Sequence, residues 1–395
     1  MRLKKIRLPF KLKKSILALG SHMKNTICFA SGRYAYLSCV NADLNNPQDL
    51  LNFEKTAKYF LKKEPQVIVC DLHPEYQSTK FAHRLRLNIC KLQFIQHHHA
   101  HIASCMAENG LKNQDVIGVA FDGTGLGSNH HLWGAEFFIC DYRRFKRTAH
   151  LREIPLLGGE MAISEPWRLV VMWLYLLYKE HFLDLKINFL KGIKKEKWQV
   201  LKKMYRLGFN APLSSSMGRL FDAVASLVLG QYKTRFEAEL AIKWERLATG
   251  YSLKTTGYRF AIVKDKDGYV VDPLPIFKEI IRDLKIKEPM AKIAYKFHLS
   301  VAEIIKRICR ILREETRINK VILSGGVFQN NLLLNLILDL LYKDGFEVLR
   351  HKEIPCNDSG ISLGQAVIAN FTYPGNTFPF EMETLSRWKW KQFLR

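Results

Sequence analysis

Closely spaced cysteines are missing from this sequence. Its eight cysteines form no CxxC pair and no tight framework, and most of them stand among apolar neighbours. Cysteines of this kind are typical of reduced, buried thiols, and they argue against a disulfide-stabilised secreted domain. We therefore expect a cytoplasmic protein.

Long hydrophobic runs are missing too. The longest apolar run, LLLNLILDLL, is interrupted by Asn335 and Asp339 and is about half as long as a membrane span. The basic N-terminus, MRLKKIRLPFKLKK, leads only into the short stretch SILALG, which is too short for a secretory signal and has no small-residue cleavage pattern. We expect no transmembrane segment, and we expect residues 1–15 to form a basic leader that is most simply a solvated tail.

Acidic residues are scarce relative to basic ones. The chain has 61 Lys and Arg against 37 Asp and Glu, which gives a formal net charge of +24. Such an excess favours anionic partners, namely nucleotides, acidic proteins, nucleic acid or a membrane surface, without choosing among them. The 395 residues, of which 48% are hydrophobic, are enough for a large core and suggest two lobes.

The order of the expected elements indicates a duplicated α/β fold. Short β-rich runs alternate with helical stretches, and a similar series of strands restarts near residue 116. This repeat is typical of actin-like and sugar-kinase folds, and no low-complexity linker divides the chain. We predict two lobes around a central cleft, over 16–115 and 116–375, with a helical insertion over about 162–317 and a C-terminal tail over 376–395.

The run QHHHAHIAS is the strongest chemical signal. His97 and His101 stand four residues apart, so both imidazoles project from one face of a helix. A strand ending at Asp122 would bring a carboxylate to the same place, and two imidazoles with a carboxylate suit a catalytic divalent metal. The alternative is that the pair is surface decoration. The neighbouring His98 and His99 are most simply solvated or support the ligands from behind.

Two glycine-rich segments follow apolar strands. DGTGLG occupies 122–127, and SGGVFQN occupies 324–330, where it opens a helix whose first amides could bind an anion. Loops of this kind on opposing half-sheets would hold a nucleotide from both sides. The alternative is two ordinary tight turns.

Several other polar residues have two possible roles. Asp358 stands where a helix begins, and the residue pattern alone favours an N-cap over a metal ligand. Arg219 and Asp222 lie one helical turn apart and either form an i,i+3 pair or serve phosphate binding. Asp71 and His73 end a strand, where they either orient a substrate or cap the following turn.

Seven segments, taken together and in this order, resemble one known family. They are CDLHPEYQST, QHHHAHIASCMAEN, FDGTGLG, EPWR, SSSMGRLFDAVASL, LSGGVFQN and NDSGISLGQA. The resemblance, from about Gly20 to Ala369, is to the C-terminal module of the hydrogenase-maturation carbamoyltransferases, the HypF family. It implies an actin-like ATPase-superfamily (ASKHA) fold that moves a carbamoyl group from carbamoyl-adenylate to an acceptor. In the hydrogenase-maturation members, that acceptor is the C-terminal cysteine of HypE.

The resemblance also implies site residues. The family's metal ligands correspond to His97, His101, Asp122 and Asp358, which changes the expected role of Asp358 from cap to ligand. Lys24 is expected near the transferred group, so that Lys24, Asp122 and Asp358 are the catalytic candidates. The expected nucleotide and carbamoyl contacts are Gly123, Thr124, Gly125, Gly218, Arg219, Asp222, Glu237, Gly325, Gly326 and Asn330.

The implied chemistry uses a divalent cofactor. The resemblance favours Fe²⁺, whereas the two-histidine, two-aspartate set by itself suits iron, manganese or zinc. Such an ion would polarise the carbamoyl carbonyl, while loop amides would stabilise the tetrahedral intermediate.

The sequence departs from the family pattern in ways that leave alternatives open. It has no acylphosphatase-like domain, no zinc motifs and no YrdC-like domain, so we expect either a fragment or a chain that needs a separate YrdC-like activating protein and a HypE-like acceptor. Locally, Ala238 and Ser359 replace family glycines. The rival functions are tRNA threonylcarbamoyl transfer, which the charge would suit, O-carbamoylation of a small molecule, and nucleotide binding without turnover. Nucleic acid is the less favoured partner.

Overall fold

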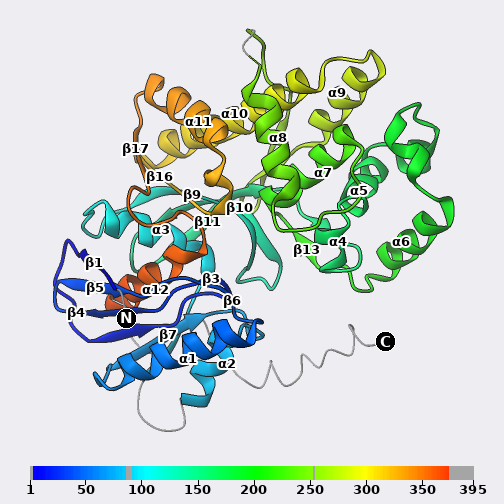
Figure 1. The fold of residues 1–395 in the computed structure, drawn as a ribbon. Helices are drawn as coiled ribbons and strands as arrows, with labels where there is room; N and C mark the ends of the chain where they lie inside the picture. Colours follow the sequence, from blue (N-terminus) through cyan, green and yellow to red (C-terminus); the bar gives the residue numbers. More distant parts are fainter. Residues whose placement is uncertain (1–2, 86–90, 252–253, 373–395) are drawn as a thin grey trace.

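The computed structural model describes residues 3–85, 91–251 and 254–372, and two large sheets organise it (Figure 1). The first sheet has the strand order β1-β5-β4-β2-β7-β8. Its strands are β1 (Lys4–Arg7), β2 (Ile16–Ala18), β4 (Cys28–Ser31), β5 (Tyr34–Leu37), β7 (Val67–Asp71) and β8 (Lys91–Ile95). A separate short pair is formed by β3 (Met23–Asn25) and β6 (Asn41–Asp43).

The second sheet has the order β14-β15-β11-β10-β9-β16-β17, with two short strands at its side. Its strands are β9 (Val116–Leu126), β10 (Leu132–Cys140), β11 (Phe145–Leu151), β12 (Ile154–Pro155), β13 (Leu213–Ser214), β14 (Ala261–Asp265), β15 (Gly268–Asp272), β16 (Lys320–Ser324) and β17 (Glu347–Arg350). β16 runs parallel to both β9 and β17, and its last residue, Ser324, pairs with Ala120, two residues before Asp122 in β9.

Helices surround both sheets (Figure 1). The α-helices are α1 (Pro47–Leu61), α2 (Gln77–Leu85), α3 (His97–Glu108), α4 (Met161–Ser164), α5 (Trp167–Tyr178), α6 (Lys195–Leu207), α7 (Met217–Leu229), α8 (Glu239–Thr249), α9 (Leu274–Lys285), α10 (Met290–Thr316), α11 (Asn331–Lys343) and α12 (Ile361–Phe371). The 3₁₀ helices are η1 (Lys179–Asp184), η2 (Asn188–Gly192), η3 (Gly326–Gln329) and η4 (Asp358–Gly360). Among the described residues, no helix is both long and apolar enough to cross a membrane.

Strand alternation explains how the first sheet is covered on both faces. Leu17 and Ile68 point to one face and pack with Phe53 of α1 in one cluster of buried side chains. Ile16 and Val67 point to the other face and pack with residues of α3 and α12 in a second cluster. Because successive side chains of a strand alternate between faces, apolar residues throughout β2 and at the first four positions of β7 predict a sheet buried on both sides.

Helix α3 lies between the two sheets and is buried all round. It contacts β9 and β16 of the second sheet and also α12, which lies on β2 and β7 of the first. Every residue from His97 to Ala107 is buried, including all four histidines. Because a buried polar group is costly without a partner, each of these imidazoles requires a defined contact.

Two expectations about local structure are wrong. The basic leader is not a solvated tail, because β1 pairs antiparallel with β5, and Ile6 and Leu8 are buried in the core. The apolar residues that alternate with lysine and arginine provide the buried face of this edge strand. Likewise, DGTGLG is not a loop after a strand, because β9 continues to Leu126 and forms a hairpin with β10, in which Gly125 pairs with Trp133.

Two further observations differ from the predicted division into lobes. The insertion over 162–317 contains a β-hairpin, β14 and β15, which extends the second sheet through parallel pairing of β15 with β11. Helix α12, predicted as part of the second lobe, packs instead on the first sheet. The predicted tail over 376–395 lies outside the described residues.

Candidate functional site

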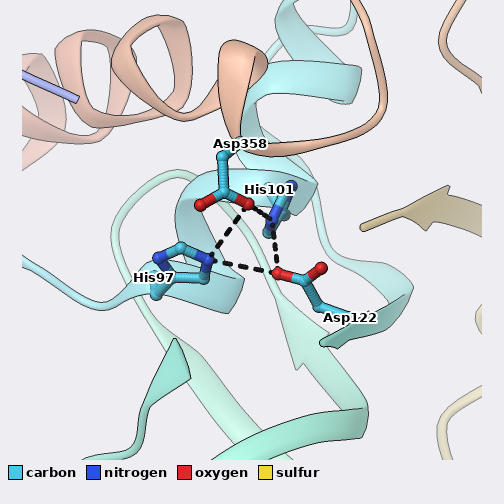
Figure 2. Close-up of side chains that lie close together, drawn as sticks. All are labelled: His97, His101, Asp122 and Asp358. Atoms are coloured by element: carbon cyan, nitrogen blue, oxygen red, sulfur yellow. Dashed lines mark hydrogen bonds and ion pairs between the residues drawn. The ribbon is translucent and has the colours of Figure 1, made fainter. Parts of the chain in front are cut away.

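Four side chains from three separate parts of the chain meet at one point (Figure 2). His97 and His101 come from the first two turns of α3, Asp122 from β9 and Asp358 from η4. The Oδ2 atom of Asp122 lies 3.3 Å from the Nε2 atom of each histidine, and the Oδ1 atom of Asp358 lies 3.7 Å from each. These donor atoms all lie within 4.8 Å of one another. The structure therefore brings together the four residues predicted as metal ligands.

The spacing of these atoms fits a divalent ion. A metal with bonds of about 2.1 Å places neighbouring ligand atoms about 3.0–3.4 Å apart. The observed separations of 3.3 Å already lie in that range, and those of 3.7 Å need only a small contraction to reach it. Imidazole nitrogen combined with carboxylate oxygen suits iron, manganese or zinc.

The charges of the cluster reinforce one another. Burial opposes protonation of the imidazoles, but Asp358 and Asp71 raise the pKa of His97 well above its ordinary value. Burial equally opposes ionisation of Asp122, but hydrogen bonds from His101 and His97 hold the pKa of Asp122 well below its ordinary value. A cation entering this site must displace protons from the imidazoles, so metal affinity should rise with pH.

Asp71 determines which nitrogen of His97 faces the cluster. Its Oδ2 atom lies 2.8 Å from Nδ1 of His97, and its Oδ1 atom accepts the backbone N–H of His73 at 3.0 Å. Asp71 is fully buried at the end of β7. It therefore both orients a candidate ligand and caps the following turn. The sequence did not indicate the contact with His97, because 26 residues separate the partners.

Asn357 caps η4, the 3₁₀ helix that leads into α12. Its side-chain oxygen accepts the backbone N–H of Ser359 at 3.1 Å, which leaves the neighbouring Asp358 carboxylate to face the histidines. Ser359, one of the departures from the family pattern, donates its hydroxyl to the carbonyl of Lys24 at 3.0 Å. The replacement of glycine by serine here thus adds a contact rather than a clash.

Glycines allow the site's elements to approach closely. Gly325 has a φ of +113°, and a Cβ atom there would lie 2.1 Å from the carbonyl oxygen of Phe121. The amide of Gly326 donates to Oδ1 of Asp122 at 3.1 Å, so the first amide of this turn holds a candidate ligand. A Cβ atom at Gly125 would lie 2.7 Å from the ring of His97. These positions require glycine for packing around the cluster.

Helix α7 begins against the same stretch of β9. Ser216 caps the helix by accepting the backbone N–H of Arg219 at 3.1 Å, and its hydroxyl donates to the carbonyl of Gly123. A Cβ atom at Gly218 would lie 3.0 Å from the Cα atom of Gly123. The i,i+3 pair, one of the two roles left open for these residues, is present, because Nε of Arg219 donates to Oδ2 of Asp222 at 2.9 Å. Their contact with a nucleotide stays a prediction. Both side chains of this pair are buried.

An ion pair joins the first part of the chain to the insertion. Nζ of Lys24, in β3, lies 2.9 Å from Oε2 of Glu237, just before α8. Burial opposes the charge of Lys24, but the hydrogen bond to Glu237 raises the pKa of the ammonium group. Ala238 has a φ of +59°, in the left-handed region that favours glycine. The family glycine at this position therefore matches the backbone conformation better than the alanine present here.

The remaining predicted residues have mainly structural contacts. Asn330 caps α11 by accepting the backbone N–H of Leu333, and its amide group contacts the ring of His298 at 2.9 Å. Its contact with a nucleotide stays a prediction. His98 and His99 were expected either to be solvated or to support the ligands from behind; both are buried, so they are not solvated. His99 donates to the carbonyl of Asp141, and burial lowers the pKa of His98 to about 3.

Comparison with known proteins agrees with this geometry. A family model described as the HypF Kae1-like domain matches residues 11–108, and one described as the carbamoyltransferase Kae1-like domain, second subdomain, matches 118–365. The chain belongs to the HypF carbamoyltransferase family. The HypF resemblance predicted above and its actin-like ATPase fold are therefore confirmed.

Individual HypF proteins show how much of the family this chain spans. It is 35% identical to the carbamoyltransferase HypF of Synechocystis, covering 91% of this chain but 48% of that protein. A HypF homolog of Cupriavidus necator is 32% identical, with 90% of this chain and 91% of that protein covered. A crystal structure of full-length HypF in the phosphate- and nucleotide-bound form superposes with a TM-score of 0.86 at 38% identity, covering 93% of this chain and 57% of that one. The chain thus spans about half the length of the Synechocystis protein.

Proposed function

We propose that this chain transfers a carbamoyl group from carbamoyl-adenylate to a thiol, the C-terminal cysteine of a HypE-like protein. The observation that carries the proposal is the convergence of His97, His101, Asp122 and Asp358 in a chain of the HypF family. The nucleotide-bound form of the related full-length HypF structure supports a donor that contains a nucleotide.

The proposed reaction joins the acceptor sulfur to the carbamoyl carbon. The thiolate attacks that carbon, the bond from carbon to the phosphate oxygen breaks, and AMP leaves with its electron pair. A divalent ion held by the four ligands would polarise the carbamoyl carbonyl. Lys24, whose charge is held by Glu237, supplies a cation close to the cluster that would balance the departing phosphate.

The donor has to be made before transfer. We propose that a YrdC-like enzyme makes carbamoyl-adenylate, which the Kae1-like module then receives. The Cupriavidus necator homolog, which this chain covers almost end to end, supports the existence of relatives of this length. We place the reaction in the reducing cytoplasm, where buried free thiols such as Cys28 and Cys70 are stable.

The test is AMP release from carbamoyl-adenylate supplied by a separate YrdC-like protein. The iron-loaded chain is compared with Asp122→Ala and with Asp115→Ala, a control carboxylate just before the same strand. Each is measured with and without a peptide ending in cysteine. We expect release that needs Asp122, tolerates loss of Asp115 and accelerates with the thiol.

Other outcomes would identify the rival functions. Release that accelerates with a hydroxyl compound and not with the thiol would indicate O-carbamoylation of a small molecule. Acceleration by tRNA, weakened by salt, would indicate the tRNA-modifying reaction. Nucleotide binding without AMP release would contradict the transferase and favour a binding module.

A further inference from the structure

A chain of buried polar side chains leads away from the candidate metal centre behind His101. The Nδ1 atom of His101 lies 3.4 Å from the hydroxyl of Ser324, at the end of β16. That hydroxyl lies 2.9 Å from Nε2 of His351, just after β17, and Nδ1 of His351 lies 2.7 Å from Oε2 of Glu108. The side chains of His351 and Glu108 are 5% and 4% exposed, so the chain is shielded from water along its length.

The hydrogen bonds along this chain can all run in one direction. If Nε2 of His101 faces the cluster without a proton, Nδ1 carries the proton and donates a hydrogen bond to the hydroxyl of Ser324. The hydroxyl of Ser324 then donates to Nε2 of His351, and Nδ1–H of His351 donates to the carboxylate of Glu108. Each donor is paired with an acceptor, and the series of hydrogen bonds ends at the carboxylate of Glu108.

The two candidate histidine ligands are therefore supported in different ways. Nδ1 of His97 contacts the carboxylate of Asp71 directly. Nδ1 of His101, by contrast, is linked to the carboxylate of Glu108 only through two intermediate side chains. Glu108 stands seven residues after His101, which puts both on one face of α3, two turns apart. The helix thus contains a candidate ligand and the end of its own supporting chain.

A purely structural role for this chain is the alternative. Glu108 also accepts backbone N–H groups from Lys352 and Ile354, which anchors the segment after β17 to the end of α3. That role would require the carboxylate but not Ser324. The Ser324 hydroxyl lies between the two imidazoles, and this position distinguishes the two roles.

We propose that Ser324, His351 and Glu108 are positioning residues that hold the imidazole of His101 with its Nε2 atom toward the metal centre. This inference rests on the metal centre of the proposed function. Supporting residues of this kind fix the tautomer and the orientation of a ligand, and their loss commonly weakens metal binding by about 10–100-fold.

The test measures Mn²⁺ affinity of the purified full chain, from the electron paramagnetic resonance signal of the free ion, together with the melting temperature of the metal-free protein. Ser324→Ala interrupts the series of hydrogen-bonded side chains between His101 and Glu108. Ser104→Ala is the matched control, because Ser104 is a buried serine of α3 whose hydroxyl has no hydrogen-bond partner among the described residues. Glu108→Gln and the Ser324→Ala, Glu108→Gln double variant test whether the residues act as one unit.

We expect Ser324→Ala to raise the Mn²⁺ dissociation constant by about 10–100-fold and Ser104→Ala to leave it within about twofold. Glu108→Gln should raise it by about tenfold, and the double variant should match Ser324→Ala, because the chain is already cut. A structural role would instead lower the melting temperature and leave the dissociation constant of the folded variants unchanged.

Three results would overturn the inference. The first is a Ser324→Ala affinity equal to that of the Ser104→Ala control. The second is a double variant whose loss equals the product of the two single losses, since the residues would then act independently. The third is a wild-type chain that binds Mn²⁺ no better than His97→Ala, which would contradict the metal centre of the proposed function as well. The first two results leave that centre intact, so the two failures are distinguishable.

Discussion

Replacing Gly364 by alanine tests how the fold brings the candidate ligands together. Gly364 lies in α12, where a Cβ atom would stand 1.8 Å from the carbonyl oxygen of Ala100, in α3. Ordinary contacts begin at 3.4 Å, so the two helices must separate by about 1.6 Å. The obstacle is backbone rather than a flexible side chain, so we expect the free energy of unfolding to fall by about 3 kcal/mol, the upper end for overpacking.

The same displacement should reach the metal centre. Asp358 begins η4, which leads directly into α12, whereas His97 and His101 lie on α3. Moving the helices apart therefore draws Asp358 away from the histidines, from which it is already 3.7 Å distant. We expect the Mn²⁺ dissociation constant to rise at least about tenfold, as it does when ligand geometry is lost.

Urea unfolding and Mn²⁺ titration measure the two effects. Gly250→Ala is the control. Gly250 directly follows α8 with a φ of −76°, and a Cβ atom added there would lie 3.9 Å from the nearest atom. That variant should change the free energy of unfolding by less than about 1 kcal/mol and leave Mn²⁺ binding unchanged. If Gly364→Ala unfolds and binds like the control, the close packing of α12 on α3 is not what positions Asp358.

Three further substitutions test other parts of the argument. Ala238→Gly should raise the free energy of unfolding in urea by about 0.5–1 kcal/mol, because it relieves a left-handed backbone; a decrease would refute this. Asp358→Ala should abolish tight Mn²⁺ binding and change the free energy of unfolding by less than about 1 kcal/mol. Asn357→Ala should instead lower the free energy of unfolding by about 1 kcal/mol and leave Mn²⁺ bound. The reverse pattern would return the capping role to Asp358. Burial opposes ionisation of Glu136, but Arg147 lowers the pKa of Glu136 from 4.5 to about 2. The ionised carboxylate therefore stabilises the fold by roughly 3 kcal/mol above pH 4.5, and this stabilisation is lost as pH falls through 2. Glu136→Gln should flatten the pH dependence of unfolding in that window, and an unchanged pH profile would count against the pairing of Glu136 with Arg147.

Local patterns in the sequence were enough for several parts of the site. The four-residue spacing of His97 and His101 predicts a shared helical face, and the helix is present with both imidazoles turned toward Asp122. The i,i+3 pairing of Arg219 with Asp222 is confirmed for the same reason. Such features depend on backbone periodicity, which a stretch of a few residues determines by itself.

Resemblance to a family was needed for Asp358. Its residue pattern favours an N-cap, yet the capping oxygen comes from the neighbouring Asn357. Either residue type caps well, so the local pattern does not say whether Asn357 or Asp358 is the cap. The choice depends on which of the two side chains the rest of the fold uses elsewhere. The contact of Asp358 with His97 joins residues 261 positions apart, and no local rule predicts it.

The sequence by itself determined the helix that carries the histidines, the face on which they lie and the family of the chain. Only the tertiary structure decided which groups surround each imidazole: Asp71 behind His97, and the chain from Ser324 to Glu108 behind His101. It also decided that the basic N-terminus forms an edge strand and that α12 returns to the first sheet. The reason is that these contacts join distant segments, and a buried polar group is satisfied by whichever partner the packing of both sheets brings within about 3 Å.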